Sequence, residues 1–334
     1  MRIAITGGGT GGHLAVAKAL MEEFDKRGIK PLYIGSERGQ EREWFKEERG
    51  FSKKIFLPSQ TVVDKKGTAK LASLISTAKL TKKALKILRE NEIETLLSVG
   101  GYSAAPASFA AILAGIDLYV HEQNSVYGRL NALLKPFAKR VFNSFMEPYD
   151  PYPIRDIFFE TSRIRTEIKR VIFLGGSQGA RQINDCALKL ASKLQKMGIE
   201  ILHQTGYKDY ERVKLEYEKL NIKAHIFPFC SQIEKKLALA DIAVSRAGAG
   251  TAWELAANAL PAIFIPYPYA ARNHQELNAR FFAERGAAII MKNCDEGAFL
   301  DIMERSPTEM SKRLASIAKK GGAGFIAERI LKKE

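Results

Sequence analysis

Cysteine is scarce in this chain of 334 residues. The three thiols are far apart in the sequence and form neither a CxxC pair nor a histidine-containing metal pattern; they are Cys186, Cys230 and Cys294. An odd number of widely spaced cysteines argues against a disulfide framework and against a structural zinc site. We therefore expect three reduced thiols, as in a cytosolic protein, and no metal-ligand cluster.

Long hydrophobic runs are also missing. No apolar run approaches the length that is needed to cross a bilayer. The chain passes from Met1 and Arg2 directly into a short apolar run, without the hydrophobic region and cleavage site of a signal peptide. We therefore expect a protein of the cytoplasm that reaches a membrane only when a membrane surface recruits it.

Acidic residues are outnumbered by basic ones, 37 to 52, which gives a formal net charge of +15. Such an excess predicts an acidic partner, namely nucleic acid, an anionic membrane surface or phosphorylated ligands. The lysines are not interleaved with aromatic residues, and no nucleic-acid recognition motif is present. We therefore expect no nucleic-acid partner.

Short β-rich runs alternate with helix-length segments in both halves of the chain. The runs are RIAIT, PLYIG, SKKIFL, TLLSVG, DLYVHE and RVFNSF, then RVIFLGG, EILHQTG, KAHIFPF, DIAVSRAG, PAIFIPYP and AAIIMK. The alternation stops over residues 145–169, where prolines, aromatics and mixed charge predict a linker. Repeated βαβ units predict an α/β fold with two doubly wound, Rossmann-like domains, residues 1–150 and 155–318. Such sheets bind ligands beyond the carboxyl ends of their strands, so we expect a site in a cleft between the domains.

Three glycine-rich turns follow predicted strands: GGGTGGH (7–13), GGYSAAPA (100–107) and GGSQGA (175–180). Bare backbone before a helix exposes N–H groups to a pyrophosphate at the positive end of the helix dipole. The first turn has the GxGxxG spacing of dinucleotide-binding proteins, but no acidic residue ends the second strand, which counts against NAD. Because one nucleotide does not need three such turns, we favour a donor and an acceptor that both carry diphosphates.

Seven motifs together give a more specific indication than any single turn. They are GGGTGGH, GGYSAAPA, HEQN, GGSQGA, HQTG, SRAGAGTAWE and NHQELNA. In order and spacing the chain resembles the MurG family of peptidoglycan glycosyltransferases. The resemblance implies the two-domain GT-B architecture, with a final helix at about 321–334 that packs back on the first domain. It also implies an inverting transfer of N-acetylglucosamine from UDP-N-acetylglucosamine to the C4 hydroxyl of the muramyl residue of lipid I, which gives lipid II.

The second domain is expected to bind the donor. Thr251 lies at a strand-to-helix turn that can approach a diphosphate, and Glu254 lies one turn further, where a carboxylate can accept both ribose hydroxyls or simply favour the helix N-terminus. The resemblance assigns Glu254 to the ribose, and it assigns the uracil to backbone groups of FPFCS and the sugar hydroxyls to NHQ, where this chain has His-Gln in place of Gln-Gln. The expected donor residues are Asn124, Arg155, Ser177, Phe229, Cys230, Arg246, Ala249, Thr251, Glu254, His274 and Gln275.

Several of these donor residues have simpler alternative roles. Ser177 can be a helix N-cap, and Asn124 can be a turn-forming asparagine. Arg155 can be solvated in a linker, and Arg246 can form a surface salt bridge.

The first domain is expected to bind the acceptor and to carry the catalytic base. His13, which ends the first glycine turn, and Glu122, at the end of a strand, both qualify as the base that accepts the hydroxyl proton. A helix N-terminus disfavours a protonated histidine, which suits a base, although His13 can equally bind phosphate. The expected acceptor-pyrophosphate residues are Thr10, Gly11, Gly12, His13, Gly101 and Tyr102.

A lipid acceptor requires a surface that meets the membrane. Residues 65–86 contain seven lysines and no acid, and Leu71, Leu74 and Ile75 fall on one helical stripe. A basic amphipathic helix of this kind can lie on anionic lipid at the cytoplasmic face of the inner membrane, or it can pack its stripe on the sheet. We expect no tightly bound cofactor; any Mg²⁺ effect would act through the phosphates.

The expected partners are UDP-N-acetylglucosamine, lipid I, an anionic membrane surface and other cell-wall synthesis proteins. Two alternatives stay open. The first is another UDP-sugar transferase or a UDP-sugar epimerase of the same fold, and the second is a non-enzymatic UDP-sugar-binding protein at the membrane surface.

Overall fold

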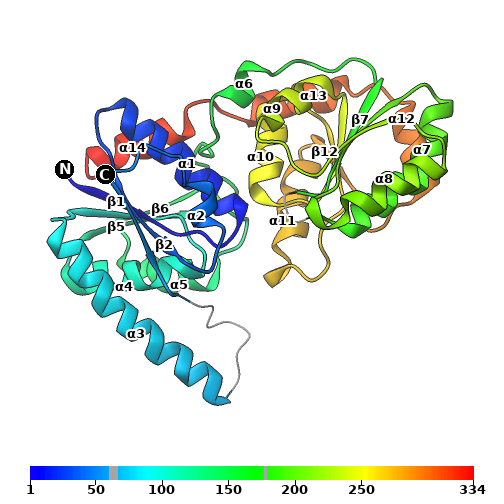
Figure 1. Ribbon diagram of the computed structural model, residues 1–334. Coiled ribbons are helices and arrows are strands. Elements are labelled where there is room, and N and C mark those ends of the chain that lie inside the picture. Colours follow the sequence, from blue (N-terminus) through cyan, green and yellow to red (C-terminus); the bar gives the residue numbers. More distant parts are fainter. Residues whose placement is uncertain (60–66, 177–178) are drawn as a thin grey trace. The chain divides into compact units, whose positions relative to one another are not determined.

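The computed structural model describes residues 1–59, 67–176 and 179–334, which divide into two compact units. The first unit comprises residues 1–154 and 321–334, and the second comprises residues 155–320 (Figure 1). Each unit is built around its own parallel sheet. The expected α/β class with two Rossmann-like domains is therefore confirmed.

The sheet of the first unit has the strand order β3-β2-β1-β4-β5-β6, and all its pairs are parallel. Its strands are β1 (Ile3–Thr6), β2 (Leu32–Ser36), β3 (Lys53–Leu57), β4 (Thr95–Ser98), β5 (Asp117–Glu122) and β6 (Arg140–Asn143). Most of these strands read as continuous apolar runs because helices cover both faces of the sheet. β1 and β4 are direct neighbours, so the two glycine turns that follow them lie side by side.

Figure 1 shows α3, α4 and α5 on one face of this sheet and α1 and α14 on the other. The helices of the unit are α1 (Gly11–Lys26), α2 (Glu41–Trp44), α3 (Gly67–Glu90), α4 (Ala105–Ala114), α5 (Arg129–Leu134) and α14 (Gly322–Leu331), with short 3₁₀ turns at η1 (Tyr102–Ala104) and η2 (Lys135–Phe137). The C-terminal helix α14 packs on α1 and on β6, where the Phe142 and Phe325 rings meet edge to face with centroids 6.4 Å apart.

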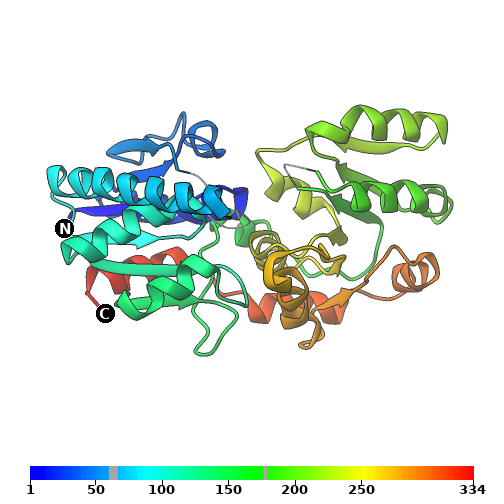
Figure 2. The same ribbon diagram turned by 90° about the horizontal axis from the view of Figure 1, so that it is seen from below.

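The sheet of the second unit has the order β12-β11-β10-β7-β8-β9 and is also parallel. Its strands are β7 (Arg170–Leu174), β8 (Glu200–Gln204), β9 (Ala224–Phe227), β10 (Ile242–Ser245), β11 (Ala262–Phe264) and β12 (Ala288–Ile290). Its helices are α6 (Ile157–Glu160), α7 (Arg181–Lys196), α8 (Tyr210–Lys219), α9 (Ile233–Leu239), α10 (Ala249–Ala257), α11 (His274–Ala283), α12 (Glu296–Met303) and α13 (Thr308–Ile317), with 3₁₀ turns η3 (Tyr207–Asp209) and η4 (Ala271–Asn273). As Figures 1 and 2 show, α7, α8 and α12 form a layer away from α10, α11 and α13.

The expectation of three reduced thiols is wrong for two of them. Cys186 on α7 and Cys294, just before α12, form a disulfide with their Cα atoms 5.5 Å apart. The two cysteines are 108 residues apart in sequence, and only the packing of the segment after β12 against α7 brings them together. Cys230 is a free cysteine, as expected.

The segment 145–169, expected to be a linker, contains a fully buried arginine. The Arg165 guanidinium donates to the carbonyl oxygens of Leu237 (3.0 Å) and Ala240 (3.2 Å) and to Oδ1 of Asn258 (2.5 Å). These acceptors lie at the C-terminal ends of α9 and α10, where a helix dipole favours a cation. Burial lowers the pKa of Arg165 to about 9. Arg165 therefore connects the incoming chain to the two helices that carry part of the pocket described below.

Within the described residues no helix is both long enough and apolar enough to cross a bilayer.

Candidate functional site

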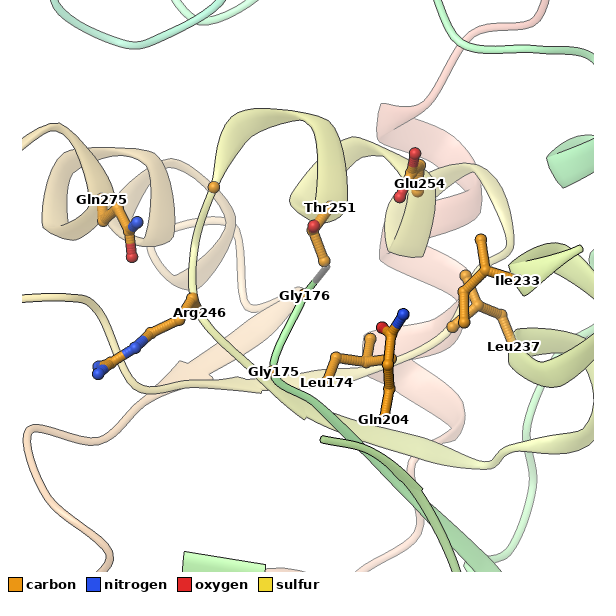
Figure 3. A pocket seen from close by; sticks show the side chains of 11 residues that line it. Leu174, Gly175, Gly176, Gln204, Ile233, Leu237, Arg246, Thr251, Glu254 and Gln275 are labelled. Atoms are coloured by element: carbon orange, nitrogen blue, oxygen red, sulfur yellow. The ribbon is translucent and has the colours of Figure 1, made fainter. Parts of the chain in front are cut away.

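The second unit contains a pocket of about 120 Å³ at the carboxyl ends of β7, β8 and β10 (Figure 3). Its walls come from the third glycine turn, from α9, from the β10–α10 turn and from α11. The residues that line it are Leu174, Gly175, Gly176, Gln204, Ile233, Leu237, Arg246, Gly248, Thr251, Glu254 and Gln275. Expected donor residues from two separate segments, the β10–α10 segment and α11, thus meet in one cavity, while Ser177 lies outside the described residues.

Glu254 is the acidic group of this pocket. It lies one turn into α10, beyond Thr251, and burial raises its pKa to about 7; the positive charge of Arg155 opposes this shift, and the negative charge of Glu234 adds to it. Arg155 therefore lies close enough to act on Glu254, although the two residues are far apart in sequence. A carboxylate with a raised pKa in a pocket is a candidate for ligand binding.

Arg246 and Gln275 form the opposite side of the pocket (Figure 3). Arg246 Nη1 donates to the carbonyl oxygens of Ile265 (2.8 Å) and Pro266 (3.0 Å), so backbone groups hold the guanidinium and no surface salt bridge is needed to explain it. Burial lowers its pKa. Oε1 of Gln275 accepts from the backbone N–H of Tyr267 at 2.9 Å, which leaves its amide N–H groups directed to other partners.

Four further donor candidates belong to the second unit and do not line this pocket. His274 begins α11, and its Nδ1 lies 2.8 Å from the carbonyl oxygen of Ala271. Ala249 is the buried first residue of α10. Phe229 and Cys230 follow β9, and the half-exposed Phe229 ring stacks on Tyr207, with centroids 6.2 Å apart.

In the first unit, the expected acceptor residues gather at the carboxyl edge of β1 and β4. The N–H of Gly8 donates to the carbonyl oxygen of Gly100 at 3.1 Å, which joins the two glycine turns. Gly101 has φ +80°, and a Cβ there would lie 2.0 Å from the carbonyl oxygen of Gly8, so only glycine fits. Tyr102 packs against Gly9.

Helix α1 begins directly after the first turn and presents its first N–H groups there. Gly11 and Gly12 are its first two residues, and the exposed Thr10 precedes them. Thr10 Oγ1 lies 2.7 Å from His13 Nδ1, so one hydrogen bond fixes the imidazole by this nitrogen and leaves Nε2 directed toward Gly100.

Glu122, the second candidate base, is buried at the end of β5. Its Oε1 accepts from the backbone N–H of Asn124 (3.0 Å), and its Oε2 accepts from the N–H of Gly128 (2.8 Å) and from Nδ2 of Asn131 (2.8 Å). Both carboxylate oxygens are therefore engaged in folding the loop between β5 and α5. That loop carries Asn124, whose carbonyl oxygen is also held by Asn143 Nδ2 at 2.9 Å.

Sequence reasoning missed three residues that shape these sites. Gln204 lines the pocket of the second unit; it belongs to the HQTG motif, which indicated this segment but not the side chain. Asn131 connects Glu122 to the glycine turn, and its Nδ2 also lies 3.3 Å from the position of a Cβ on Gly100. Glu41 contacts the first glycine turn from a short helix with no recognisable motif. Nothing in the local sequence of Asn131 or Glu41 indicates these contacts.

Two Rossmann-like units, one of which has an acid-containing pocket at the carboxyl ends of its strands, are typical of two-domain enzymes that bind nucleotides. Residues 3–143 match the model of the glycosyltransferase family 28 N-terminal domain, and residues 170–322 match that of its C-terminal domain. The chain belongs to glycosyltransferase family 28, and the expected membership of its MurG group is confirmed.

Full-length relatives carry one common name. A protein of a Nitratiruptor species is 50% identical over 332 residues, 99% of each chain, and one of Campylobacter jejuni is 49% identical over 335 residues, 99% of this chain and 98% of the relative. Both are named UDP-N-acetylglucosamine--N-acetylmuramyl-(pentapeptide) pyrophosphoryl-undecaprenol N-acetylglucosamine transferase.

Solved structures agree with this assignment. The crystal structure of MurG from Acinetobacter baumannii is 27% identical to this chain, with a TM-score of 0.79 over 99% of each chain. The UDP-GlcNAc 2-epimerase from Neisseria meningitidis has a TM-score of 0.67 over 99% of this chain and all of its own, but at 13% identity it shows the shared fold alone.

Proposed function

We propose that this enzyme transfers N-acetylglucosamine from UDP-N-acetylglucosamine to the C4 hydroxyl of the muramyl residue of lipid I, with inversion at the anomeric carbon, and so forms lipid II. The proposal depends above all on the relatives of that name, which are about 50% identical over nearly the whole chain. The donor pocket around Glu254 supplies the matching chemistry.

On the donor side, we assign the Glu254 carboxylate to the ribose hydroxyls and the turn at Thr251 to the diphosphate. Arg246 lines the same pocket and adds positive charge, which stabilises the charge that grows on the leaving UDP. Gln275 supplies amide groups for the sugar, and the backbone near Phe229 and Cys230 reads the base.

On the acceptor side, we assign the general base to His13. We assign the tautomer in which Nδ1–H donates to Thr10 Oγ1, so that Nε2 accepts the hydroxyl proton as the oxygen attacks the anomeric carbon and the bond to UDP breaks. Glu122 is the weaker candidate because both of its oxygens already accept hydrogen bonds. We assign Glu122 to holding Asn124, which would contact the sugar.

The amides at the start of α1, together with Gly101 and Tyr102, would hold the acceptor diphosphate. Within the described residues no group of three acidic, histidine or cysteine side chains could hold a metal ion. We therefore assign any stimulation by Mg²⁺ to its binding to the substrate phosphates.

Helix α3 would bring the enzyme to the cytoplasmic face of the membrane that carries its lipid acceptor. Leu71, Leu74 and Ile75 are 61%, 48% and 51% exposed, so this part of the stripe is not buried against the sheet. Leu113, at the end of the neighbouring helix α4, is 70% exposed. Apolar side chains beside many lysines can bind anionic lipid, and the same surface could accept other cell-wall synthesis proteins.

The proposal is tested by UDP release from UDP-N-acetylglucosamine, with and without a soluble lipid I analogue. Release should require the acceptor, and Glu254→Ala should abolish it, while the exposed control Glu211→Ala should leave it unchanged. If the donor binds but no UDP is released with this acceptor, the named reaction is wrong. Formation of an epimerised UDP-sugar in place of a disaccharide would favour the epimerase alternative.

A further inference from the structure

Glu41 is a buried charge to which the proposed reaction gives no role. It begins the short helix α2, five residues after β2 ends, and it is 0% exposed. Its Oε1 accepts from the backbone N–H of Gly9 (3.0 Å) and of Ser36 (3.3 Å), while its Oε2 has no hydrogen-bond partner among the described residues. Burying a carboxylate lowers the stability of the fold unless its hydrogen bonds compensate for the lost hydration. We therefore look for a role of Glu41 at this position.

Three hydrogen bonds connect the first glycine turn to other segments of the protein. The hydroxyl of Tyr33 donates to the carbonyl oxygen of Gly7 at 2.7 Å. The N–H of Gly8 donates to Gly100, and the N–H of Gly9 donates to Glu41. The N–H groups of Gly8 and Gly9 are therefore already used and cannot cradle a phosphate of a ligand.

Glycines on both sides make room for this carboxylate. A Cβ on Gly8 would lie 2.5 Å from Oε1 of Glu41, and a Cβ on Gly39 would lie 1.7 Å from Oε2. Gly8 also has φ +158°, at the limit of the region that glycine favours. The backbone of the turn thus fits a carboxylate in the place where a glycine-rich turn commonly holds an anion.

We propose that Glu41 is a positioning residue of the acceptor site: its carboxylate occupies the first glycine turn as an internal anion and so restricts the acceptor diphosphate to the amides that follow Thr10. The inference rests on the proposed function. Gly9 directly precedes Thr10, and Thr10 holds His13 at 2.7 Å, so the contact at Gly9 also fixes the start of the segment that carries the proposed base.

Substitutions at Glu41 separate this role from a general effect on folding. Glu41→Gln keeps an oxygen that can accept from Gly9 and Ser36, whereas Glu41→Ala removes it. We expect Glu41→Ala to raise the KM for the lipid I analogue about tenfold and to leave the KM for UDP-N-acetylglucosamine within about twofold, since one charged hydrogen-bonding group is lost on the acceptor side alone. Glu41→Gln should keep both values. The exposed Glu43, on the same helix, gives the matched control Glu43→Ala.

Hydrogen exchange gives a second readout that does not depend on activity. The amides of Gly9 and Ser36 should exchange slowly in the wild type and in Glu41→Gln and quickly in Glu41→Ala. Fast exchange of Gly9 in the wild type would overturn the proposal, as would an unchanged acceptor KM in Glu41→Ala or an equal rise in both KM values. If Glu41→Ala does not fold, Glu41→Asp, which draws the carboxylate back by one methylene, replaces it with the same expected split.

These readouts also separate the two proposals. A wild-type enzyme that does not use the lipid I analogue would refute the proposed reaction, while slow exchange at Gly9 would still support the internal anion.

Discussion

Glu254 is expected to weaken the fold at neutral pH in return for binding the donor. Its pKa is raised from 4.5 to about 7, first by burial and further by Glu234, with Arg155 opposing the shift. We predict that Glu254→Gln makes the protein more stable at pH 8 and at the same time weakens donor binding. Gain of stability with loss of function is typical of residues that are kept for ligand binding.

The sign and the size of this difference in stability follow from proton linkage. Below pH 4.5 the carboxyl is protonated in both the folded and the unfolded chain, so no stability is lost. As the pH rises from 4.5 to 7 the unfolded chain ionises first, and the folded state loses stability until both forms are charged. A shift of roughly 2.5 pKa units corresponds to about 3 kcal/mol. Because Glu254 is partly open to the pocket, we expect about 2 kcal/mol in practice.

Urea unfolding of the wild type and of Glu254→Gln at pH 4.5 and pH 8 measures this difference directly. The variant should be more stable than the wild type at pH 8 and should lose this advantage at pH 4.5. Equal stability of the two proteins at pH 8 would refute the argument that the charge of Glu254 is poorly solvated.

Donor affinity gives the opposite pH dependence, because the ribose hydroxyls need the ionised carboxylate. With a pKa of about 7, the ionised fraction falls about tenfold between pH 8 and pH 6. The Kd for UDP-N-acetylglucosamine, measured by calorimetry, should therefore rise about tenfold over that interval. Glu254→Gln should bind weakly with no pH dependence, and a constant wild-type Kd would contradict the assignment.

Three further predictions follow from the described contacts. His13→Ala should lower kcat by about a hundredfold or more in steady-state UDP release, with the donor KM unchanged, and unaltered turnover would exclude His13 as the base. Arg165→Met should lower the free energy of unfolding by about 3 to 5 kcal/mol in urea, because buried carbonyl groups lose their donor; a loss under 1 kcal/mol would contradict this. The double variant Leu74→Glu and Ile75→Glu should no longer sediment with anionic vesicles, whereas the exposed control Leu215→Glu should, and unchanged binding of the double variant would refute the membrane surface.

The architecture could be predicted from the sequence because its signals are local. All the predicted β-rich runs correspond to strands of the two sheets, since parallel strands covered on both faces read as short apolar runs between helices. The structure divides the chain between residues 154 and 155, and the C-terminal helix belongs to the first compact unit. In contrast, Cys186 and Cys294 pair across 108 residues, and no spacing rule within the sequence indicates that pairing.

The proposed donor pocket could be predicted only in part from the sequence. Thr251 and Glu254 could be placed on a strand-to-helix turn from the sequence alone, because turn and helix follow each other directly. Gln204 belongs to a different βα unit, and only the order of the strands brings it to the same cavity. The raised pKa of Glu254 likewise depends on Arg155 and Glu234, which come from other elements.

The glycine turns show why a motif predicts a backbone conformation better than it predicts a ligand. The first and third turns both follow the first strand of a sheet and precede its first long helix. In both turns one glycine N–H donates to a backbone carbonyl of the neighbouring turn, Gly8 to Gly100 and Gly175 to Gln204, and Gly175 and Gly176 still line a pocket. The first turn differs at Gly9, whose N–H donates to a side chain, Glu41, that reaches the turn from outside the motif. Whether a glycine-rich turn binds an external anion therefore depends on which of its N–H groups the fold leaves without an internal acceptor.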